Sequence, residues 1–506
     1  MIRFWRNPLV ILHVRSSLRP ARAAMAAALS LIVCGLIAMG CWSEHSGNHK
    51  DFWVYFYAIL LGSQFILLGF WSASQCGQAV AQERQLKTFD FLKTTRLTTA
   101  EIMVGMWLGA PVTAYFVVAC TLPLTILAGL VAGISAAAIL ASIVLLLAFN
   151  LFYSLLALMA SMLVEKSSSG AIGLVGILAN LFFLSFMNGP FKGFTAISVL
   201  PSVLNLYHLD TDLGRLEPTV FGIHVPCILL TLALYAALGA WLVLIIVRNL
   251  KRDLPEIQPL SRWQCVGLAA FANLLFYAFL DMSRMTSSLA IQGSPFTGDA
   301  SHEVAGYAVA WNSVFLFLIG IAALSPREKL KVWWRKWKAG ESSYLDPGGL
   351  PWPWLVPAAI IGYGLLAAEA LGMRSAIPLG EWRLGISALA FGAFLIFTIR
   401  DILFLQWCLL TRMKHPIIKG LLVLGLYNVA VGLVGIVSAV IDLSSTSKIL
   451  SLLTPYVVLS HLDPQVGPVA FFLGGIALQS GVCVLILLAI QKRLSRPVHA
   501  PVGGEA

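Results

Sequence analysis

Long apolar runs dominate this chain and restrict it to folds that a membrane can hold. A helix needs about 20 apolar residues to cross roughly 30 Å of hydrocarbon. We place twelve such runs, at 22–41, 53–73, 104–129, 135–164, 170–188, 226–248, 264–281, 304–324, 353–372, 384–403, 419–441 and 467–490. We therefore expect an all-α, multi-pass membrane protein with about twelve transmembrane helices.

The composition favours the same class of protein. Hydrophobic residues make up 59% of the 506 residues and charged residues 11%, whereas charged residues make up about 25% of an ordinary soluble protein. The eight cysteines are scattered without a C-x-x-C pair, so we interpret them as small apolar residues rather than as disulfides or metal ligands. We expect the chain in the cell membrane, either an inner or a plasma membrane.

The distribution of Lys and Arg predicts how the chain is oriented. Cytoplasmic loops of membrane proteins carry an excess of these residues. With the N-terminus placed in the cytoplasm, 27 of the 34 Lys and Arg residues fall on the cytoplasmic side. Both termini are therefore expected in the cytoplasm. The net charge of +11 follows from this asymmetry, so it does not indicate nucleic-acid binding.

A repeated sequence predicts two halves. Ser198–Asp210 and Ser451–Asp463 align at an offset of 253 residues, and both end in His-Leu-Asp. Both copies fall outside the cell, before the last apolar run of their half. We expect six-helix halves at 1–250 and 251–506, with the same orientation and related by an axis along the membrane normal.

A few polar residues are candidates for contact with a substrate. The two His-Leu-Asp sequences offer polar groups on the outer side, although such a sequence more often closes a turn or caps a helix. An acid near the outer end of the ninth run is a further candidate because acids are costly to bury in lipid. These candidates are His208, Asp210, Glu369, His461 and Asp463. Asn150, Asn180, Asn428 and Gln479 are expected to join helices by hydrogen bonds.

A charged segment, 74–103, lies between the second and third apolar runs. Thr98 and Glu101 have the spacing of a capping box, and Leu97 and Ile102 flank it as a hydrophobic staple. We therefore expect a helix to begin after Thr98 and to lead into the third run. For Glu101 this capping role is the better explanation.

Upstream of that box, Leu86, Phe89 and Leu92 recur every third residue. This spacing predicts a short helix with one apolar and one charged face. A short connection between two spans does not need such a helix, so we interpret it as a docking element for a soluble partner. The alternative is a surface helix that rests on lipid headgroups.

The same segment resembles the loop that follows the second span in ABC-2 type permeases, the membrane subunits of ATP-driven exporters. Their pattern there is roughly E-R-x-x-G-T-L-E-x-L-L-x-T-P-L-x-x-x-E-I-x-x-G-K. The chain departs from it most at Lys87, Arg96 and Met106, where the pattern has Gly, Pro and Lys. The matching residues are Glu83, Arg84, Thr88, Leu92, Thr95, Leu97, Glu101, Ile102 and Gly105.

The resemblance implies that the segment couples the membrane helices to an ATPase subunit, of which two copies are expected in the complex. The coupling residues would be Glu83, Arg84, Thr88, Phe89, Leu92, Leu97 and Glu101. It also implies export by alternating access. ABC-2 permeases often open with a short basic elbow helix, and Asn7-Pro8 predicts the start of such a helix at the membrane surface.

In the second half, the segment 325–340 occupies the corresponding position. Ser325 to Glu328 has the spacing of a capping box with a proline at the first turn. Tryptophans then recur at helical spacing among basic residues. We expect either a membrane-surface anchor or a second ATPase contact, formed by residues that include Trp333, Trp334, Arg335 and Lys336.

No nucleotide-binding motif of the form G-x-x-x-x-G-K-[ST] occurs in the chain. We therefore expect a transport subunit that is not itself an enzyme, has no cofactor of its own, and uses ATP bound by a partner. One chain or a homodimer could form the translocation unit, and the substrate stays open. The alternatives are a secondary transporter with six plus six helices and, less favoured, a membrane-embedded enzyme.

Overall fold

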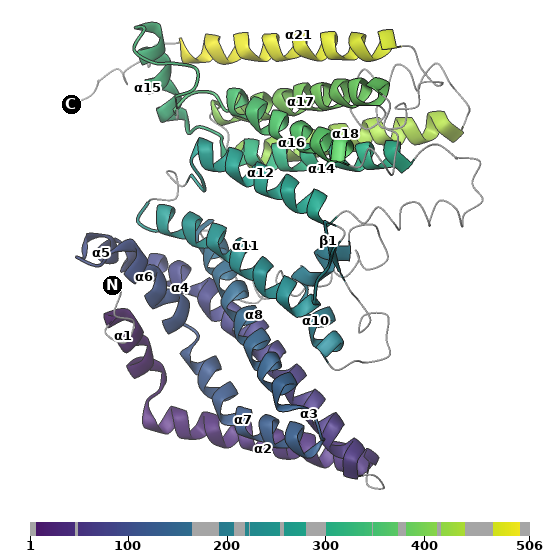
Figure 1. The fold of residues 1–506 in the computed structure, drawn as a ribbon. Helices are drawn as coiled ribbons and strands as arrows, with labels where there is room; N and C mark the ends of the chain where they lie inside the picture. The colour runs from purple at the N-terminus through teal and green to yellow at the C-terminus, as the bar shows by residue number, and fades with distance from the viewer. Residues whose placement is uncertain are drawn as a thin grey trace, which may run out of the picture. The chain divides into compact units, whose positions relative to one another are not determined.

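The computed structural model describes residues 7–45, 49–163, 192–206, 218–221, 223–252, 258–279, 300–346, 348–372, 381–411, 416–440 and 469–495. The chain divides into two compact units (Figure 1). Unit 1 comprises Met1–Pro259 with Phe279–Asp281, and unit 2 comprises Leu260–Ala278 with Met282–Ala506. We describe each unit by itself.

The described part of unit 1 is helical apart from one short hairpin. Its elements are α1 (Pro8–Ser17), α2 (Pro20–His45), α3 (His49–Ile66), the π-helix η2 (Leu67–Ser72), α4 (Ala73–Gln85), α5 (Phe89–Thr94), α6 (Thr99–Gly109), α7 (Val112–Val131), α8 (Ala136–Leu163), the 3-10 helix η4 (Lys192–Ile197), α10 (Val199–Leu206), β1 (Thr219–Val220), β2 (Ile223–His224) and α11 (Cys227–Asn249). The elements α3, η2 and α4 run on as one helix, His49–Gln85.

Helix α8 forms the centre of unit 1, because α4 and α11 both pack against it. Aromatic rings fill this interface: Phe152 stacks on Tyr235 with ring centroids 4.8 Å apart. The π-turn of η2 brings its backbone close to α8, since a Cβ on Gly69 would lie 2.7 Å from the Phe149 ring. Only glycine fits at that position without a shift of the ring.

Buried polar side chains join the helices of unit 1. Gln64 on α3 donates hydrogen bonds to Thr121 and Thr125 on α7, at 2.9 and 2.7 Å. Asn150 on α8 donates to the Tyr115 hydroxyl of α7 at 3.2 Å. The expectation that Asn150 joins helices is therefore confirmed.

Unit 2 has the elements α12 (Arg262–Ala278), α14 (Ala300–Ala322), α15 (Arg327–Lys338), α16 (Trp352–Gly372), α17 (Glu381–Leu409), α18 (Pro416–Val440) and α21 (Val469–Leu494). Helix α17 is central, with α14 and α21 packed against it. It thus has the neighbours that α8 has in unit 1, namely the second long helix and the last helix of its half. The repeat of two six-helix halves stays a prediction.

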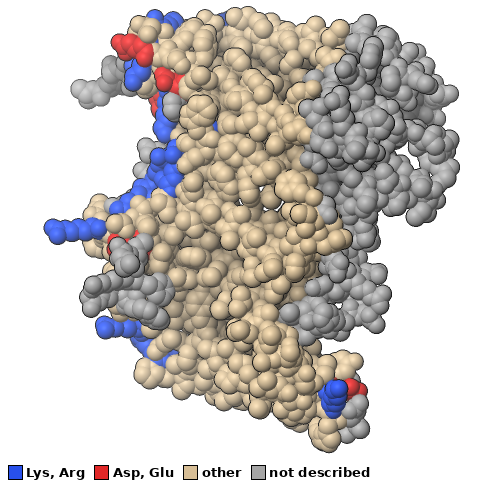
Figure 2. Space-filling view, viewed as in Figure 1, with Lys and Arg blue, Asp and Glu red and all other residues tan. Residues whose placement is uncertain are grey.

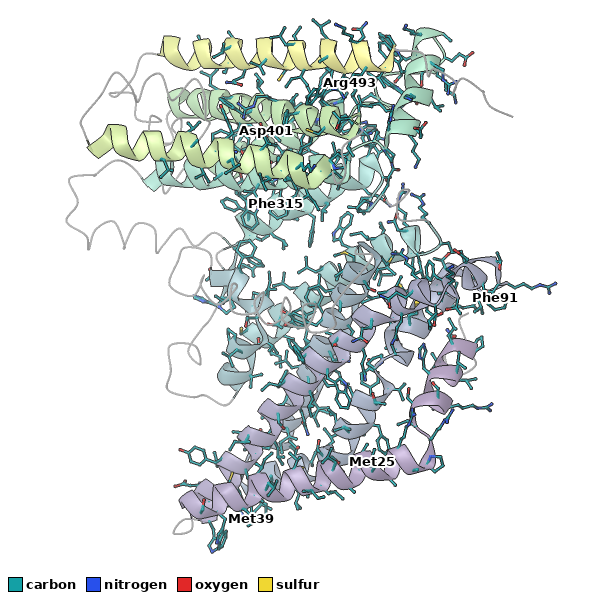
Figure 3. All side chains as sticks on the ribbon, turned by 180° about the vertical axis from the view of Figure 1, so that it is seen from behind. Met25, Met39, Phe91, Phe315, Asp401 and Arg493 are labelled. Carbon is teal, nitrogen blue, oxygen red and sulfur yellow. The ribbon has the colours of Figure 1, made fainter. Side chains whose placement is uncertain are left out.

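Among the described residues, seven helices are long and apolar enough to cross a membrane, or eight if the bent pair α14 and α15 counts as one span. Met25 and Met39 on α2 are among the large apolar side chains that face outward (Figure 3), as lipid contact requires. The predicted span 170–188 lies outside the described residues, and of α16 and α18 the fully described apolar parts are Trp352–Ala368 and Pro416–Val431. Twelve spans therefore stay a prediction.

Candidate functional site

The segment 74–103 folds as three helices joined by tight turns. Helix α4 ends at Gln85, α5 is short, and α6 begins at Thr99. Between α4 and α5 the chain reverses at Lys87, which has a φ of +58°. This left-handed conformation is costly for a residue with a Cβ and easy for glycine.

That reversal changes which side chains share a face. Phe89 is buried, at 4% exposed, whereas Leu86 is 69% exposed. The predicted apolar face through Leu86, Phe89 and Leu92 is therefore wrong, because no single helix contains the first two residues. The side chain of Leu92 lies outside the described part of the chain.

Glu83 and Thr88 hold the turn between α4 and α5. The Thr88 backbone N–H donates to the Glu83 carbonyl at 3.0 Å, and its hydroxyl donates to the Glu83 carboxylate. The same hydroxyl lies 3.2 Å from the Glu83 carbonyl. Glu83 thus closes the turn from within the chain rather than projecting as an isolated charge.

Arg84 anchors the turn to the centre of unit 1. Its guanidinium donates to the Met162 carbonyl at 3.0 Å, near the end of α8. The guanidinium also lies 5.2 Å from the centroid of the Phe89 ring. Arg84 therefore positions the loop against α8.

The capping box at the start of α6 is confirmed. The Glu101 N–H donates to the Thr98 hydroxyl at 3.2 Å, and the Thr98 N–H donates to the Glu101 carboxylate at 2.8 Å. Hydrogen bonds from the backbone and then the hydroxyl of Thr98 lower the pKa of the Glu101 carboxyl. Leu97 packs against the core cluster that contains Ile102, as a hydrophobic staple requires.

Sequence analysis missed a further anchor of this loop. The Lys251 ammonium group donates to the Leu97 carbonyl at 2.8 Å. Lys251 follows α11, so the loop is tied to the end of that helix as well as to α8. A lone lysine near a span end has no distinctive sequence signal, because the positive-inside pattern already accounts for it.

Helix α1 begins as predicted, with the Asn7 side chain accepting from the Leu9 N–H at 3.0 Å and a proline at the first turn. Asn7 also donates to the Glu101 carbonyl at 2.7 Å, which joins the elbow helix to the capping box. A Cβ on Gly105 would lie 2.6 Å from Leu9, so α1 and α6 approach closely there. A side chain larger than glycine at position 105 would force this contact apart.

The outer face of the segment, which we call the coupling tip, consists of Leu86, Lys87, Asp90, Phe91 and Arg96. All five side chains are exposed, and Phe91 is 72% exposed. Figure 3 shows Phe91 projecting from the end of unit 1. Large apolar side chains exposed on a structured loop mark a contact surface, for a protein partner or for the membrane. In the face that Figure 2 shows, Lys and Arg gather at this end of the unit.

In unit 2, α15 bends by 87° from α14. Leu330, Trp333 and Trp334 are buried, and they pack against residues of α17 and α21 that include Leu403 and Ile490. The tryptophans therefore do not form a stripe that faces the membrane.

The basic residues Arg335 and Lys336 of α15 are exposed. The predicted capping box at its start is wrong, because Pro326 is the N-cap and Ser325 is buried. The Ser325 hydroxyl instead accepts from Arg262 at 2.8 Å. Burial lowers the pKa of Arg262 to about 10.

A turn after α15 exposes two more apolar side chains, Tyr344 and Leu345, which we call the second tip. The Trp333 indole N–H donates to the Ser343 carbonyl at 3.0 Å, and the Ser343 N–H donates to the Asp346 carboxylate at 3.3 Å. The turn is thus held in shape by α15. The second tip follows α15 in the chain as the coupling tip follows α4.

An ion pair inside a candidate span is a second feature that sequence analysis missed. Arg400 lies in the candidate span Phe391–Leu409 of α17, and its guanidinium lies 2.7 Å from the Asp401 carboxylate. It donates to Gln479 on α21 at 3.0 Å and faces the Tyr427 ring of α18. Gln479 joins helices as predicted. The predicted run 384–403 contained Arg400, but the charge count placed this residue at the cytoplasmic end of the run.

The remaining predicted candidates stay untested. His208, Asp210, His461 and Asp463 lie outside the described residues, as does Asn180. Glu369 lies in α16, but its side chain is not described. Asn428 donates to the Leu424 carbonyl of its own helix. Within the described residues, no group of three or more His, Cys, Asp or Glu side chains could hold a metal ion.

Comparison with known proteins gives no match to a family model, to a curated protein or to a solved structure. Any functional argument therefore depends on the residues and on the geometry of the loop.

The left-handed backbone at Lys87 predicts that Lys87→Gly stabilises unit 1. Glycine removes the steric cost of this conformation and loses more entropy on folding, so we expect a net gain of roughly 0.5–1 kcal/mol. Thermal unfolding in detergent measures it. Lys87→Ala is the matched control and should give no gain, because alanine keeps the Cβ. Equal melting temperatures for the two variants would contradict this account of the turn.

His13 of α1 predicts a pH dependence of the elbow contact. A Cβ on Gly109 of α6 would lie 2.9 Å from the His13 ring, and burial lowers the His13 pKa while the Glu83 carboxylate raises it less. The neutral ring is therefore favoured in the folded state. Its contribution to stability is complete above the ordinary value of 6.5 and is lost as the pH falls through the folded pKa.

We expect the melting temperature of the wild type to fall more than that of His13→Gln between neutral pH and pH about 5. A His13→Gln variant with the full wild-type pH dependence would show that another group is responsible.

Proposed function

We propose that the chain is the permease subunit of an ABC-2 type exporter, which moves a substrate across the membrane with ATP hydrolysed by a separate subunit. The observation that carries this proposal is the coupling tip. A loop fixed to α1, α8 and α11 holds Leu86 and Phe91 exposed at the basic end of unit 1. A loop that only connected two spans would need neither the anchors nor the exposed apolar pair.

The geometry also gives physical roles to the residues of the family pattern. Glu83 and Thr88 close the turn, Arg84 fixes it to α8, and Glu101 caps α6. The pattern has glycine where Lys87 adopts a left-handed conformation. The resemblance thus concerns residues that determine the shape of the loop, and the partner would contact the residues that this shape exposes.

The anchors suggest how a partner's movement would reach the membrane helices. A push on the coupling tip acts on α4, which continues through η2 into α3. The bonds from Arg84 and Lys251 carry the same movement to α8 and α11. These helices belong to one packed cluster, so they would move together.

In unit 2 we propose the second tip, Tyr344 and Leu345, as the contact for a second ATPase subunit, with the basic residues of α15 beside it. Lys336 and Lys338 are exposed and would attract an acidic surface. One chain would then bind two ATPase subunits through unequal sites. Native mass measurement of the purified complex tests this, and two permease chains with two ATPases would contradict it.

A secondary transporter of six plus six helices is the second candidate, and the Arg400–Asp401 pair is the observation that favours it. Charges within a span are costly and often belong to a transport pathway. Transport by the purified chain in vesicles that contain no ATPase would decide for this alternative.

The proposal predicts that Leu86→Ser with Phe91→Ser abolishes or strongly weakens capture of an ATPase subunit. Both side chains are exposed, so the protein should insert and fold normally, and the loss comes from the apolar contact with the partner. Trp42→Ser is the matched control, because Trp42 is 49% exposed at the other end of α2 from the elbow helix. Co-purification measures the effect, and capture at the wild-type level by the double variant would exclude the coupling tip.

The proposed topology has twelve spans with both termini in the cytoplasm. It predicts that a cysteine at Asn48 is labelled by an impermeant reagent from outside, and that cysteines at Gln85 and Lys336 are protected until the membrane is opened. The reason is the concentration of Lys and Arg near the last two positions. Labelling of Lys336→Cys from outside would overturn the arrangement of the second half.

A further inference from the structure

The hairpin before α11 exposes two apolar side chains on a structured tip. Strands β1 and β2 pair with Val220 opposite Ile223. Phe221 is 55% exposed and Ile223 is 69% exposed. Phe221 has a φ of +50°, an uncommon conformation for an aromatic residue. The backbone therefore holds this ring at the turn despite a steric cost.

The base of the hairpin is anchored, so its tip is not a frayed end. Pro218 is buried, and its carbonyl accepts from the Val225 N–H at 3.1 Å. Strand β1 also contacts η4, whose residues Thr195 and Ala196 are buried. Figure 1 shows β1 beside the N-terminal end of α11. The exposed side chains are thus displayed at a defined distance from that helix.

The position of the hairpin along the chain indicates what covers its tip. Pro226 is the N-cap of α11, and α11 is a candidate span of 23 residues. At 1.5 Å per residue this helix is about 34 Å long, which covers the hydrocarbon core and places the hairpin at the boundary with the headgroups.

The charges of this region fit a lipid environment. No Asp, Glu, Lys or Arg occurs between Pro218 and Val247, whereas Arg248, Lys251 and Arg252 follow at the other end of α11. An acidic or basic protein surface would find no complementary charge on the hairpin. Apolar side chains next to a span, on a hairpin whose own residues include no Asp, Glu, Lys or Arg, suit the headgroup and acyl boundary of a bilayer.

We propose that the tip of this hairpin, Phe221 and Ile223, inserts into the lipid leaflet on the side of the membrane opposite the coupling tip. The ligand is the bilayer itself, and the contact fixes the depth at which α11 begins. The inference rests on the proposed membrane topology and is independent of any ATPase partner.

Spin labels at the tip test the proposal. Phe221→Cys and, separately, Ile223→Cys are labelled with a nitroxide in a Cys120→Ser background, because Cys120 is the partly exposed native cysteine among the described residues. The full chain is reconstituted in phosphatidylcholine vesicles. The accessibility of each label to oxygen, which concentrates in lipid, is compared with its accessibility to a water-soluble nickel chelate.

We expect the ratio of oxygen to nickel accessibility to be several-fold higher at both tip positions than at a label on Phe91→Cys, which lies in water when no ATPase is present. A high nickel accessibility at both positions would place the hairpin in water and overturn the proposal. Low accessibility to both reagents would show that a protein surface covers the tip, for example a second copy of the chain, and would also overturn it.

The same labels separate this inference from the proposed function. If the tip is in lipid but Leu86→Ser with Phe91→Ser still captures an ATPase, the exporter assignment of the coupling tip fails and the hairpin contact stands. If the ATPase contact is lost as expected but the tip is in water, the hairpin contact fails and the exporter assignment stands.

Discussion

A polar group in the hydrocarbon interior of a membrane has no water to bind, and this constraint shapes the interfaces of both units. The backbone meets it by forming helices. Polar side chains also bond across helix contacts: the amide N–H group of Gln64 donates to Thr121 and Thr125 in unit 1, and that of Asn273 donates to Asn312 in unit 2. These bonds add directional contacts to helices whose apolar surfaces would pack on lipid as readily as on one another.

The loop between α4 and α6 follows a different logic, because water is available there. Its shape depends on local bonds: a turn closed by Glu83, a cap made by Thr98 and Glu101, and anchors from Arg84 and Lys251. Most of these groups form hydrogen bonds with backbone atoms of the loop or of the helices beside it. The exposed side chains of Leu86 and Phe91 make none of these bonds, so the apolar pair offered to a partner differs from the residues that hold the loop.

Features that depend on neighbouring residues could be predicted from the sequence. The caps at Asn7 and Thr98 need only partners two or three residues away, and both are present. The capping box predicted at Ser325 was wrong, because the Ser325 hydroxyl accepts a hydrogen bond from the distant Arg262 and does not cap α15. The prediction of an apolar face through Leu86 and Phe89 was wrong because the left-handed residue Lys87 ends the helix between them. The apolar residues of α15 do lie on one face, as their helical spacing predicts. The sequence does not reveal that α17 and α21 cover this face.

The pair formed by Arg400 and Asp401 has a consequence for how unit 2 is made. Both charges belong to α17 and are neighbours in the chain, so each can neutralise the other as soon as that helix forms. Gln479 and Tyr427, which complete the site, are synthesised later. If the partner of Arg400 lay on α21, the arginine charge would stay unpaired until α21 had been synthesised. Because its counter-ion lies in the same helix, α17 can insert into the membrane with both charges already paired.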